Sequence, residues 1–373
     1  MRQMLVSSDD ILSTFSTKHK NTTSNYLSYL RLKGKIPLLQ ISKKLNIPYR
    51  TLQSWSYGST PAPIKHVKFL EKLGAIPINL DENNEIFLLL VRCLAFVFGD
   101  GHINFKGTET IFTGFKDDLE CLKYELENNF KIKCRMKPAS GAAYHLIAPA
   151  TLTRILLAMG APRGNKIVQK FQLPSWLIKS PKKIKTEFLS TLFGNESNAI
   201  VRDSNTKNAF YPPQFSMNKS VEYEKSHVIF LTRIKELLKE FEIGTTKIKK
   251  FNLHTRKDGT KVWRYSFNID RNLRNLIRFY LIVGFMYAFR KQATYEYRLR
   301  KKIGFLHEAN SKIRTYHNVM RLRKMGYGDK KISKMLNINR SGVHHWIYHN
   351  VKPKYLDAEK EIQELINSFN SPA

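Results

Sequence analysis

The sequence predicts an α+β fold in which two copies of one folding unit lie between small all-α modules at the ends of the chain. Two apolar segments of similar pattern, each ending at an acidic residue, stand 96 positions apart, and strand and helix patterns follow each of them. A second pair of similar segments lies near the two termini. Self-similarity of this kind indicates internal duplication. We therefore expect four domains, at residues 1–75, 85–172, 183–302 and 310–373.

The terminal pair has the pattern of a helix-turn-helix. In residues 38–58, apolar positions share one face of a first helix, a turn follows at Asn46, and Leu52 and Trp55 anchor a second helix. Residues 332–349 repeat residues 41–58 with eight identities in eighteen positions. The second helix of such a module places exposed side chains in the major groove of DNA. These side chains are Tyr49, Arg50 and Gln53 in the first module and Arg340, Ser341 and His344 in the second.

For each module the alternative is a helical hairpin that contributes only to packing. Pro61, Pro63 and residues 75–84 are expected to form the link from the first module to the core.

Residues 91–103 (VRCLAFVFGDGHI) and 187–200 (EFLSTLFGNESNAI) each predict a short buried helix that ends at an acidic residue, Asp100 or Glu196. Both helices carry small residues four positions apart: Ala95 and Gly99 in the first, Ser190 and Gly194 in the second. Residues at this spacing share a helix face, and small side chains let two helices approach closely. We therefore expect the two helices to pack against each other through these residues.

Close packing would bring the two carboxylates together at the carboxyl ends of the helices. That end of a helix carries roughly half a negative charge, and neighbouring carboxylates repel each other. Divalent cations such as Mg²⁺ or Ca²⁺ prefer oxygen ligands and would offset this charge. The pattern thus predicts a metal-dependent hydrolase site formed by Asp100 and Glu196. For residues 99–101 the alternative is an ordinary helix C-cap and turn, in which glycine is common.

Both halves of the core repeat the order helix, two strands, helix, two strands, helix. In the first half we expect strands at residues 102–105, 110–114, 131–137 and 143–147, and helices at 117–130 and 151–159. In the second half we expect strands at residues 199–203, 210–217, 245–254 and 261–268, and helices at 221–241 and 273–289. Residues 172–183 connect the two halves.

The segments LAFVFGDGHI and FLSTLFGNES resemble the two motifs of the LAGLIDADG homing endonucleases in their single-chain form. Asp100 stands at the position of the metal-binding acid in the first motif. In the second motif Glu196 replaces the commoner Asp, and Ser197 replaces the usual Gly. The resemblance covers roughly residues 86–302. It implies a pseudo-twofold pair of αββαββα repeats with saddle-shaped antiparallel sheets, and an Mg²⁺ site at Asp100, Glu196 and the preceding residues Gly99 and Asn195.

Basic side chains are frequent in the expected strands and turns. Twisted antiparallel ribbons can lie in the major groove, where each base pair presents its own pattern of donors and acceptors, and some cations would contact phosphates only. The DNA contacts expected in this region are Lys106, Arg135, Lys137, Arg202, Lys249, Lys250, His254, Arg256 and Arg264. For any single lysine, a solvated surface charge is the alternative.

Phosphodiester hydrolysis needs an activated water and stabilisation of charge on the phosphoryl oxygens, and metals held by two carboxylates can supply both. The resemblance implies a catalytic lysine at Lys166, in the loop after the last helix of the first repeat. Lys291 holds a similar position in the second repeat, with Arg290 as the alternative. Asn218 and Lys219 lie at a strand end where the family often has a Gln or Lys facing the metals, and we favour Asn218. The first repeat has only Gly114 there.

The composition indicates a polyanionic partner. The chain of 373 residues has 63 Lys and Arg against 30 Asp and Glu, a formal charge of +33. Such a surface attracts nucleic acid, and an anionic membrane is less favoured because no basic amphipathic helix stands out. No apolar run is long enough for a membrane span, and no signal peptide is evident. The three cysteines form no CxxC pair, which is typical of a reducing compartment.

We expect a monomer in the cytoplasm, associated with the nucleoid, or in an organelle interior, and not a secreted protein. The resemblance implies an endonuclease that cuts both strands of a long, nearly asymmetric duplex with divalent metal, and the terminal modules would add affinity by tethering. Two alternatives remain: a DNA-binding regulator of the same fold that has lost cleavage, and an intron maturase that binds RNA. Val351 follows His349-Asn350 where an intein requires Ser, Thr or Cys, so we expect no protein splicing.

Overall fold

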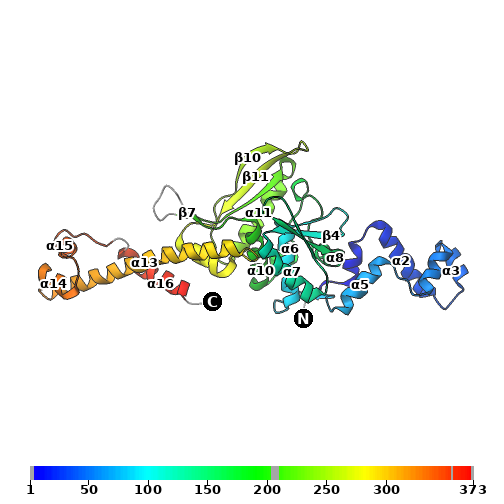
Figure 1. The fold of residues 1–373 in the computed structure, drawn as a ribbon, viewed down its shortest axis with the longest axis horizontal. Helices are drawn as coiled ribbons and strands as arrows, with labels where there is room; N and C mark the ends of the chain where they lie inside the picture. The colour runs from blue at the N-terminus through cyan, green and yellow to red at the C-terminus, as the bar shows by residue number, and fades with distance from the viewer. Residues whose placement is uncertain (1–3, 203–209, 354–355, 371–373) are drawn as a thin grey trace.

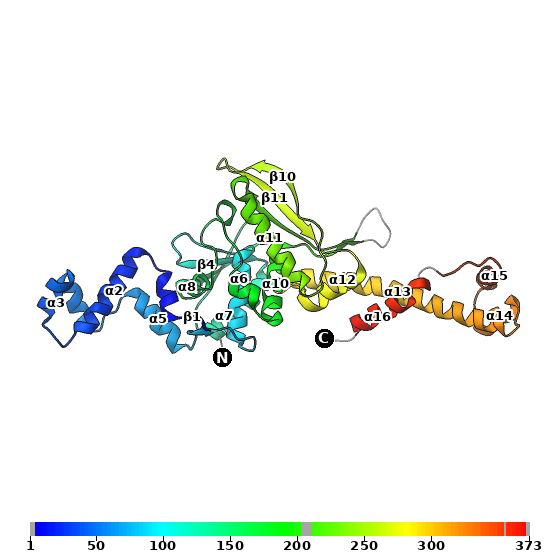
Figure 2. The same ribbon diagram turned by 180° about the vertical axis from the view of Figure 1, so that it is seen from behind.

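The structure, a computed structural model, describes residues 4–202, 210–353 and 356–370. Figure 1 shows an elongated molecule with a central core of helices and antiparallel strands and an arm of helices at each end. The longest strands project from one side of the core, as the view from behind in Figure 2 also shows. The predicted α+β class with antiparallel sheets is therefore confirmed. Within the described ranges, no helix combines the length and the apolar character that a membrane crossing requires.

The first half of the core follows the predicted element order. Its elements are α6 (Glu85–Phe98), β3 (His102–Ile103), β4 (Glu109–Gly114), α7 (Lys116–Phe130), β5 (Arg135–Pro138), β6 (Tyr144–Pro149) and α8 (Ala150–Ala158). The four strands form one antiparallel sheet in the order β3-β4-β6-β5. The strand predicted from residue 131 begins only at Arg135, because Lys131 closes α7 in the left-handed conformation (φ 50°) and Ile132 and Cys134 are buried in the core.

The second half repeats the element order with a different sheet. Its elements are α10 (Lys182–Glu196), β7 (Val201–Arg202), β8 (Phe210–Tyr211), β9 (Gln214–Ser220), α11 (Glu224–Lys239), β10 (Lys249–Thr255), β11 (Lys261–Asn268) and α12 (Leu273–Arg278). Here β10, β11 and β9 form a three-stranded sheet in that order, and β7 and β8 form a separate ribbon. The continuous strand predicted at residues 210–217 is wrong, because Pro212 and Pro213 lack the N–H groups that a strand ladder uses.

The N-terminal arm contains the first predicted helix pair. Its elements are β1 (Met4–Val6), α1 (Ser8–Ser13), α2 (Thr17–Leu32), α3 (Leu38–Leu45), α4 (Tyr49–Ser56), α5 (Ala62–Lys72) and β2 (Ile78–Asn79). Asn46 joins α3 to α4 in the left-handed conformation (φ 50°), and Leu52 and Trp55 are buried as predicted. The linker predicted at Pro61, Pro63 and residues 75–84 is wrong in part. Proline is tolerated at the start of a helix, so α5 begins at the two prolines, and β2 pairs antiparallel with β1.

The C-terminal arm is built on one long helix that the sequence patterns did not predict. This helix, α13 (Phe289–Lys324), is followed by α14 (Asp329–Leu336), α15 (Arg340–Tyr348) and α16 (Glu359–Asn370). Asn337 joins α14 to α15 in the left-handed conformation (φ 51°), as Asn46 does in the first module. α13 runs without a break through residues 302–310, where a domain boundary was expected. The helix predicted at residues 273–289 ends at Arg278, and a single π-helical turn and Gly284 (φ 58°) separate it from α13.

Candidate active site

α6 and α10 lie side by side in the core (Figure 1), and their carboxyl ends come close together at Gly99 and Asn195. A Cβ atom on Gly99 would lie 3.1 Å from Cβ of Asn195 and 3.3 Å from Cγ of Glu196, so glycine permits the close approach expected at this position. Farther back along the helices, Nε of Arg92 donates to Oε2 of Glu187 at 2.6 Å. The two helices are therefore held together at their ends and along their length.

The small residues of α10 face a different segment. Oγ of Ser190 accepts a hydrogen bond from the amide of Met286 at 3.0 Å, and the carbonyl oxygen of Met286 is the nearest atom to the missing side chain of Gly194. The prediction that Ser190 and Gly194 pack against α6 is therefore wrong. They instead admit the chain segment before α13, because only glycine lets a backbone approach so closely.

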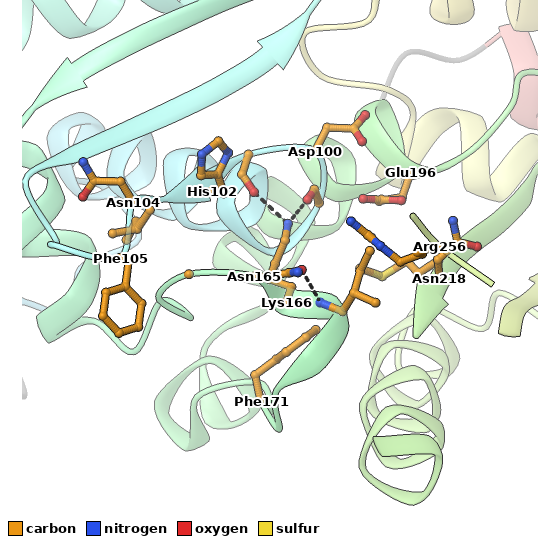
Figure 3. Close-up of a pocket in the computed structure, with 16 residues that line it drawn as sticks. Asp100, His102, Asn104, Phe105, Asn165, Lys166, Phe171, Glu196, Asn218 and Arg256 are labelled. Atoms are coloured by element: carbon orange, nitrogen blue, oxygen red, sulfur yellow. Dashed lines mark hydrogen bonds between the residues drawn. The ribbon is translucent and has the colours of Figure 1, made fainter. Parts of the chain in front are cut away.

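Asp100 and Glu196 line one open cavity of about 770 Å³ (Figure 3). Asp100 follows Gly99, the C-cap of α6, and Glu196 is the last residue of α10. Desolvation raises the pKa of the Glu196 carboxyl, and the charge of Asp100 raises this pKa further. Desolvation also raises the pKa of Asp100, while two neighbouring lysines act in the opposite direction. The folded chain thus brings one carboxylate from each half into a single electrostatically coupled pair.

Lys166 holds the carboxyl end of α6. Its ammonium donates to the main-chain oxygens of Val97 and Gly101, both at 2.7 Å, and to that of Gly99 (Figure 3). A cation at this end of a helix offsets the negative pole of the helix dipole. Desolvation lowers the pKa of Lys166, although the two acids raise it again.

Lys291 stands in the same relation to α10. Its ammonium donates to the main-chain oxygens of Gly194 at 2.6 Å and Asn195 at 3.2 Å. Desolvation lowers the pKa of Lys291, while both acids raise it. Arg290, the alternative from the sequence, is exposed, and its Nη2 lies 3.8 Å from Oδ2 of Asp117. Both residues line a cavity that Asp100 also lines, but only the Lys291 ammonium engages the end of α10, whereas the Arg290 guanidinium lies beside Asp117.

Other parts of the large cavity wall come from strands of both halves. Asn218 of β9 lines the cavity, as does Arg256 in the turn after β10 (Figure 3). His102 of β3 lines it as well, and the sequence reasoning did not single out this residue. Desolvation lowers the pKa of the His102 imidazole, and the charge of Lys166 lowers it further. The sequence offered one signal that His102 belongs to the site, which is its position two residues after Asp100.

Lys219, which the sequence reasoning set aside in favour of Asn218, is a buried cation. It follows Asn218 in β9, so its side chain points to the opposite face of the strand, and only 1% of its surface is exposed. Its ammonium donates to the main-chain oxygens of Lys166 and Gln169 and lies 4.2 Å from the ring centre of Phe171. Desolvation lowers the pKa of Lys219 to about 8. The sequence contained a signal for this burial. Side chains alternate between the two faces of a strand, and the residues two and four positions before Lys219 are apolar and buried.

Asp100 also lines a second cavity of about 220 Å³ on the side of α13. Gly114 of β4 and Lys291 of α13 form part of its wall. Asp118 borders the same cavity, and its Oδ1 accepts the amide of Phe289, the first residue of α13, at 3.0 Å. Asp100 therefore lies between two cavities, with Lys166 at one and Lys291 at the other.

The donors at the site suit a hard divalent cation. The two carboxylates supply oxygen ligands, and Mg²⁺ is commonly held by one or two carboxylates together with water and substrate phosphates. Among the residues that the structure describes, no group of three or more His, Cys, Asp or Glu side chains could hold a metal ion. The main-chain oxygens of Gly99 and Asn195, the other two residues expected to hold the metal, each accept a hydrogen bond from a lysine, Lys166 or Lys291. The two carboxylates are therefore the strongest oxygen donors at the site.

Arg264 shares the open face of the second-half sheet with Asn218. Directly paired residues on neighbouring strands lie on the same face, and β11 pairs Arg264 with Asn218. Lys250 pairs with Tyr265 instead, and its ammonium lies 2.9 Å from a carboxylate oxygen of Glu224 in α11. Lys250 therefore lies on the face of the sheet that α11 covers. A side chain that contacts DNA bases is expected on the open face instead.

The other cations expected to contact DNA lie at the surface. Arg135 is exposed and donates to Oε1 of Glu109 at 2.8 Å. The side chain of Arg202 lies outside the described residues, and Arg256 is half-buried. The remaining members of the set are exposed: Lys106, Lys137, Lys249, His254 and Arg264.

Both terminal modules present the expected side chains to solvent. These are Tyr49, Arg50 and Gln53 on α4 and Arg340, Ser341 and His344 on α15. In the second module, Oδ2 of Asp329 accepts from Nε of Arg340 at 3.0 Å and lies 3.3 Å from Nδ1 of His344. An acid at the start of α14 thus orients two side chains of the second helix.

No protein-family model matches the chain. The chain is 28% identical over 228 residues to the tRNA-splicing ligase RtcB of Pyrococcus furiosus, which covers 57% of this chain and 22% of that protein. It is 30% identical over 252 residues to the DNA-directed RNA polymerase subunit Rpo1N of Methanocaldococcus jannaschii (60% and 18%). It is 26% identical over 197 residues to the replication factor C small subunit of the same organism (48% and 10%). The chain spans about a fifth or less of the length of these relatives.

Two solved structures show similarity at low sequence identity. The homing endonuclease I-DmoI in complex with DNA and Mn is 15% identical, with 52% of this chain and 96% of that chain covered and a TM-score of 0.32. Full-length DUF199/WhiA from Thermatoga maritima is 13% identical, with 82% and 98% covered and a TM-score of 0.34.

Proposed function

We propose that this chain is a metal-dependent DNA endonuclease of the LAGLIDADG homing type, which cuts both strands of a long, nearly asymmetric duplex. One observation carries the proposal: Asp100 and Glu196, one from each half, line a single cavity at the ends of two packed helices. Each half also contributes one lysine, Lys166 or Lys291, to the end of its own helix. A pseudo-twofold pair of repeats accounts for this arrangement, and it makes the site complete in a monomer.

Each group at the site has a role in phosphodiester hydrolysis. Mg²⁺ held by Asp100 and Glu196 supplies, when bound, a Lewis acid that lowers the pKa of water and stabilises charge on the phosphoryl oxygens. The positive charges of Lys166 and Lys291, next to the acids, would stabilise the negative charge that develops on the scissile phosphate. Asn218 can orient the attacking water from the wall of the larger cavity.

The cationic surface supports DNA as the substrate. The formal charge of +33 favours a polyanion, and the face of the sheet that carries Asn218 also carries Arg264. An antiparallel sheet with exposed basic side chains can contact the major groove of a duplex. The terminal modules extend this contact surface at both ends of the molecule (Figure 2).

The curated relatives support an activity distinct from those in their names. One is named a ligase, one an RNA polymerase subunit and one a replication factor subunit, yet the chain matches a fifth or less of each. A segment common to such different proteins is better explained as a self-contained element carried within them than as the part that ligates, polymerises or replicates. A homing endonuclease is an element of this kind.

The test uses the purified full chain, Mg²⁺ and a plasmid library with randomised inserts. Wild-type protein should linearise a set of plasmids that share one long site, and recovery of the cut ends identifies that site. Asp100→Asn and Glu196→Gln should bind the site and give no linear product. Asp117→Asn, a change at an exposed acid, is the matched control and should cut as wild type does. Cleavage that survives both site variants would refute the assignment.

A DNA-binding regulator without cleavage is the second candidate. Lysine ammonium groups engage the main-chain oxygens of Gly99 and Asn195, so a metal ion would share these oxygens with a lysine. Tight, sequence-specific binding without any product in Mg²⁺ or Mn²⁺ would favour the regulator. Preference for a structured RNA over every duplex in the library would favour a maturase instead.

A further inference from the structure

The C-terminal arm is built on α13, a single helix that begins at the candidate active site. The amide of Phe289, its first residue, donates to Asp118, and Lys291 in its first turn donates to the end of α10. The 36 residues of α13 give a length of about 54 Å at 1.5 Å per residue. The far end enters the core of the second helix-turn-helix, which is formed by Val319, Leu322, Ile332 and Val343. One rigid element therefore connects the acids to the second module.

Neighbouring segments brace α13 along most of its length. Ile313 belongs to the hydrophobic core of the central part, and Val319, six residues later, belongs to the core of the second module. α16 packs along α13 (Figure 1), and its Ile362 is buried in the central core. Nδ2 of Asn310 in α13 donates to Oε1 of Gln363 in α16 at 2.7 Å. Only about one and a half helical turns lie between the two cores, which leaves no room for a flexible joint.

The N-terminal arm is attached to the central part in a similar way. α5 carries Ile64 into the core of the first module and Val67 into the central core. Nη1 of Arg154 in α8 donates to the main-chain oxygen of Thr14 at 2.7 Å, and the guanidinium lies 4.1 Å from the ring centre of Phe15. The antiparallel pairing of β1 with β2 closes this attachment.

We infer that both modules are held at fixed distances from the paired acids, and that the DNA substrate is a three-part site with fixed spacing. The inference rests on the proposed binding of duplex DNA. From Lys291 to Val319, α13 rises about 42 Å, which corresponds to about 12 base pairs at roughly 3.4 Å each. Figures 1 and 2 show α13 along the long axis of the molecule, with α15 on the side toward which β10 and β11 project. A duplex along this axis, on that side, contacts the central sheets and the second module together.

A module on a flexible tether would behave differently from one on a braced helix. A tethered module reaches its part of the site over a range of spacings, because its effective concentration changes gradually with the distance to be spanned. A braced module reaches its part at one distance and one rotational phase. About 5 added base pairs turn the outer part of the site to the opposite side of the duplex, and about 10 restore the phase but not the distance.

The test measures binding by full-length Asp100→Asn protein, so that it does not depend on cleavage. Duplexes are selected from a randomised pool, and hydroxyl-radical footprinting maps one central and two outer protected blocks. Insertions of about 5 or about 10 base pairs are then placed between the central block and the block of the second module. Each insertion should weaken binding at least about tenfold, to the affinity measured with a scrambled outer block. Unchanged affinity at both insertions, or protection of the central block alone, overturns the inference.

Substitutions at Gly304 test whether the straight helix α13 is what fixes the spacing. This glycine lies within α13 with open space around its missing side chain, so Gly304→Ala fits and is the control. Gly304→Pro removes an amide donor and kinks the helix. The proline variant should lose the outer block and keep the central one, which also shows that its core has folded. A complete three-part footprint from this variant contradicts the inference, and if its central block is lost too, the insertion series decides alone.

Failure of the proposed nuclease activity has its own readout. Wild-type protein would then give no linear product from the selected duplex in Mg²⁺, whatever footprint it leaves.

Discussion

The ammonium of Lys219 donates a hydrogen bond to the main-chain oxygen of Lys166. It joins β9 in the second half of the core to the loop that carries the lysine at the end of α6. A second bond, to the main-chain oxygen of Gln169, holds the same loop. The position of Lys166 at the candidate active site therefore depends on both halves of the chain.

Replacing Lys219 by methionine should lower the free energy of unfolding by about 1–3 kcal/mol, because two main-chain oxygens lose their buried donor. The cleavage rate should fall as well, since the loop under Lys166 loses its support. Urea unfolding and single-turnover cleavage measure the two effects. Lys225→Met, at an exposed position of α11, is the control and should change neither quantity. Wild-type stability in Lys219→Met would show that the buried contact contributes nothing.

Lys219 also predicts that stability rises with pH above about 8. Its pKa in the folded chain is lowered to about 8 from an ordinary value of 10.5. Between these values the unfolded chain keeps a proton that the folded chain has lost, so the free energy of unfolding increases with pH. Urea unfolding across this window should show a steeper increase for wild type than for Lys219→Met. Identical pH slopes in the two proteins would argue against a lowered pKa.

Lys291 and Arg290 are adjacent cations with opposite expected effects. Lys291→Met removes the ammonium at the end of α10, so the cleavage rate should fall at least about a hundredfold, as for loss of other charge-stabilising donors. Arg290→Met changes an exposed side chain and should act as wild type. Because Lys166 is unaffected, nicked circles should accumulate before linear plasmid in the Lys291 variant. The opposite ranking of the two variants would assign the role to Arg290.

Mg²⁺ should raise the thermal unfolding temperature of the wild-type chain, because it binds the folded pair of carboxylates and offsets their repulsion. Burial raises the pKa of Glu196, so binding near neutral pH should also release protons. Calorimetric titration in two buffers of different ionisation heat measures that release. Asp100→Asn should lose the thermal shift and Asp117→Asn should keep it. An equal shift in all three proteins would place the metal elsewhere.

Asp118 should stabilise the start of α13. Its carboxylate accepts the amide of Phe289, so Asp118→Ala removes a helix cap and should lower the free energy of unfolding by about 0.5–2 kcal/mol. Asp117→Ala changes the adjacent exposed acid and is the matched control. Equal losses in the two variants would mean that the capping contact has no special effect.

Elements set by local pattern were predicted close to their observed positions. The strand predicted at residues 261–268 matches β11, because apolar and polar residues alternate along it. The turns at Asn46 and Asn337 were predicted in both terminal modules, since asparagine tolerates the left-handed conformation seen at both. α13 was missed because its buried residues enter two separate hydrophobic cores, so no single apolar face repeats along the helix.

The basic charge, the acids at the ends of two apolar helices and the paired terminal modules could all be recognised in the residue order, because each is a property of the composition or of near neighbours in the chain. Packing alone decided which groups meet. Lys219 reaches Lys166 across 53 positions, and Ser190 meets Met286 across 96. Such contacts depend on where distant donors and acceptors come to lie after folding, and local spacing carries no information about that.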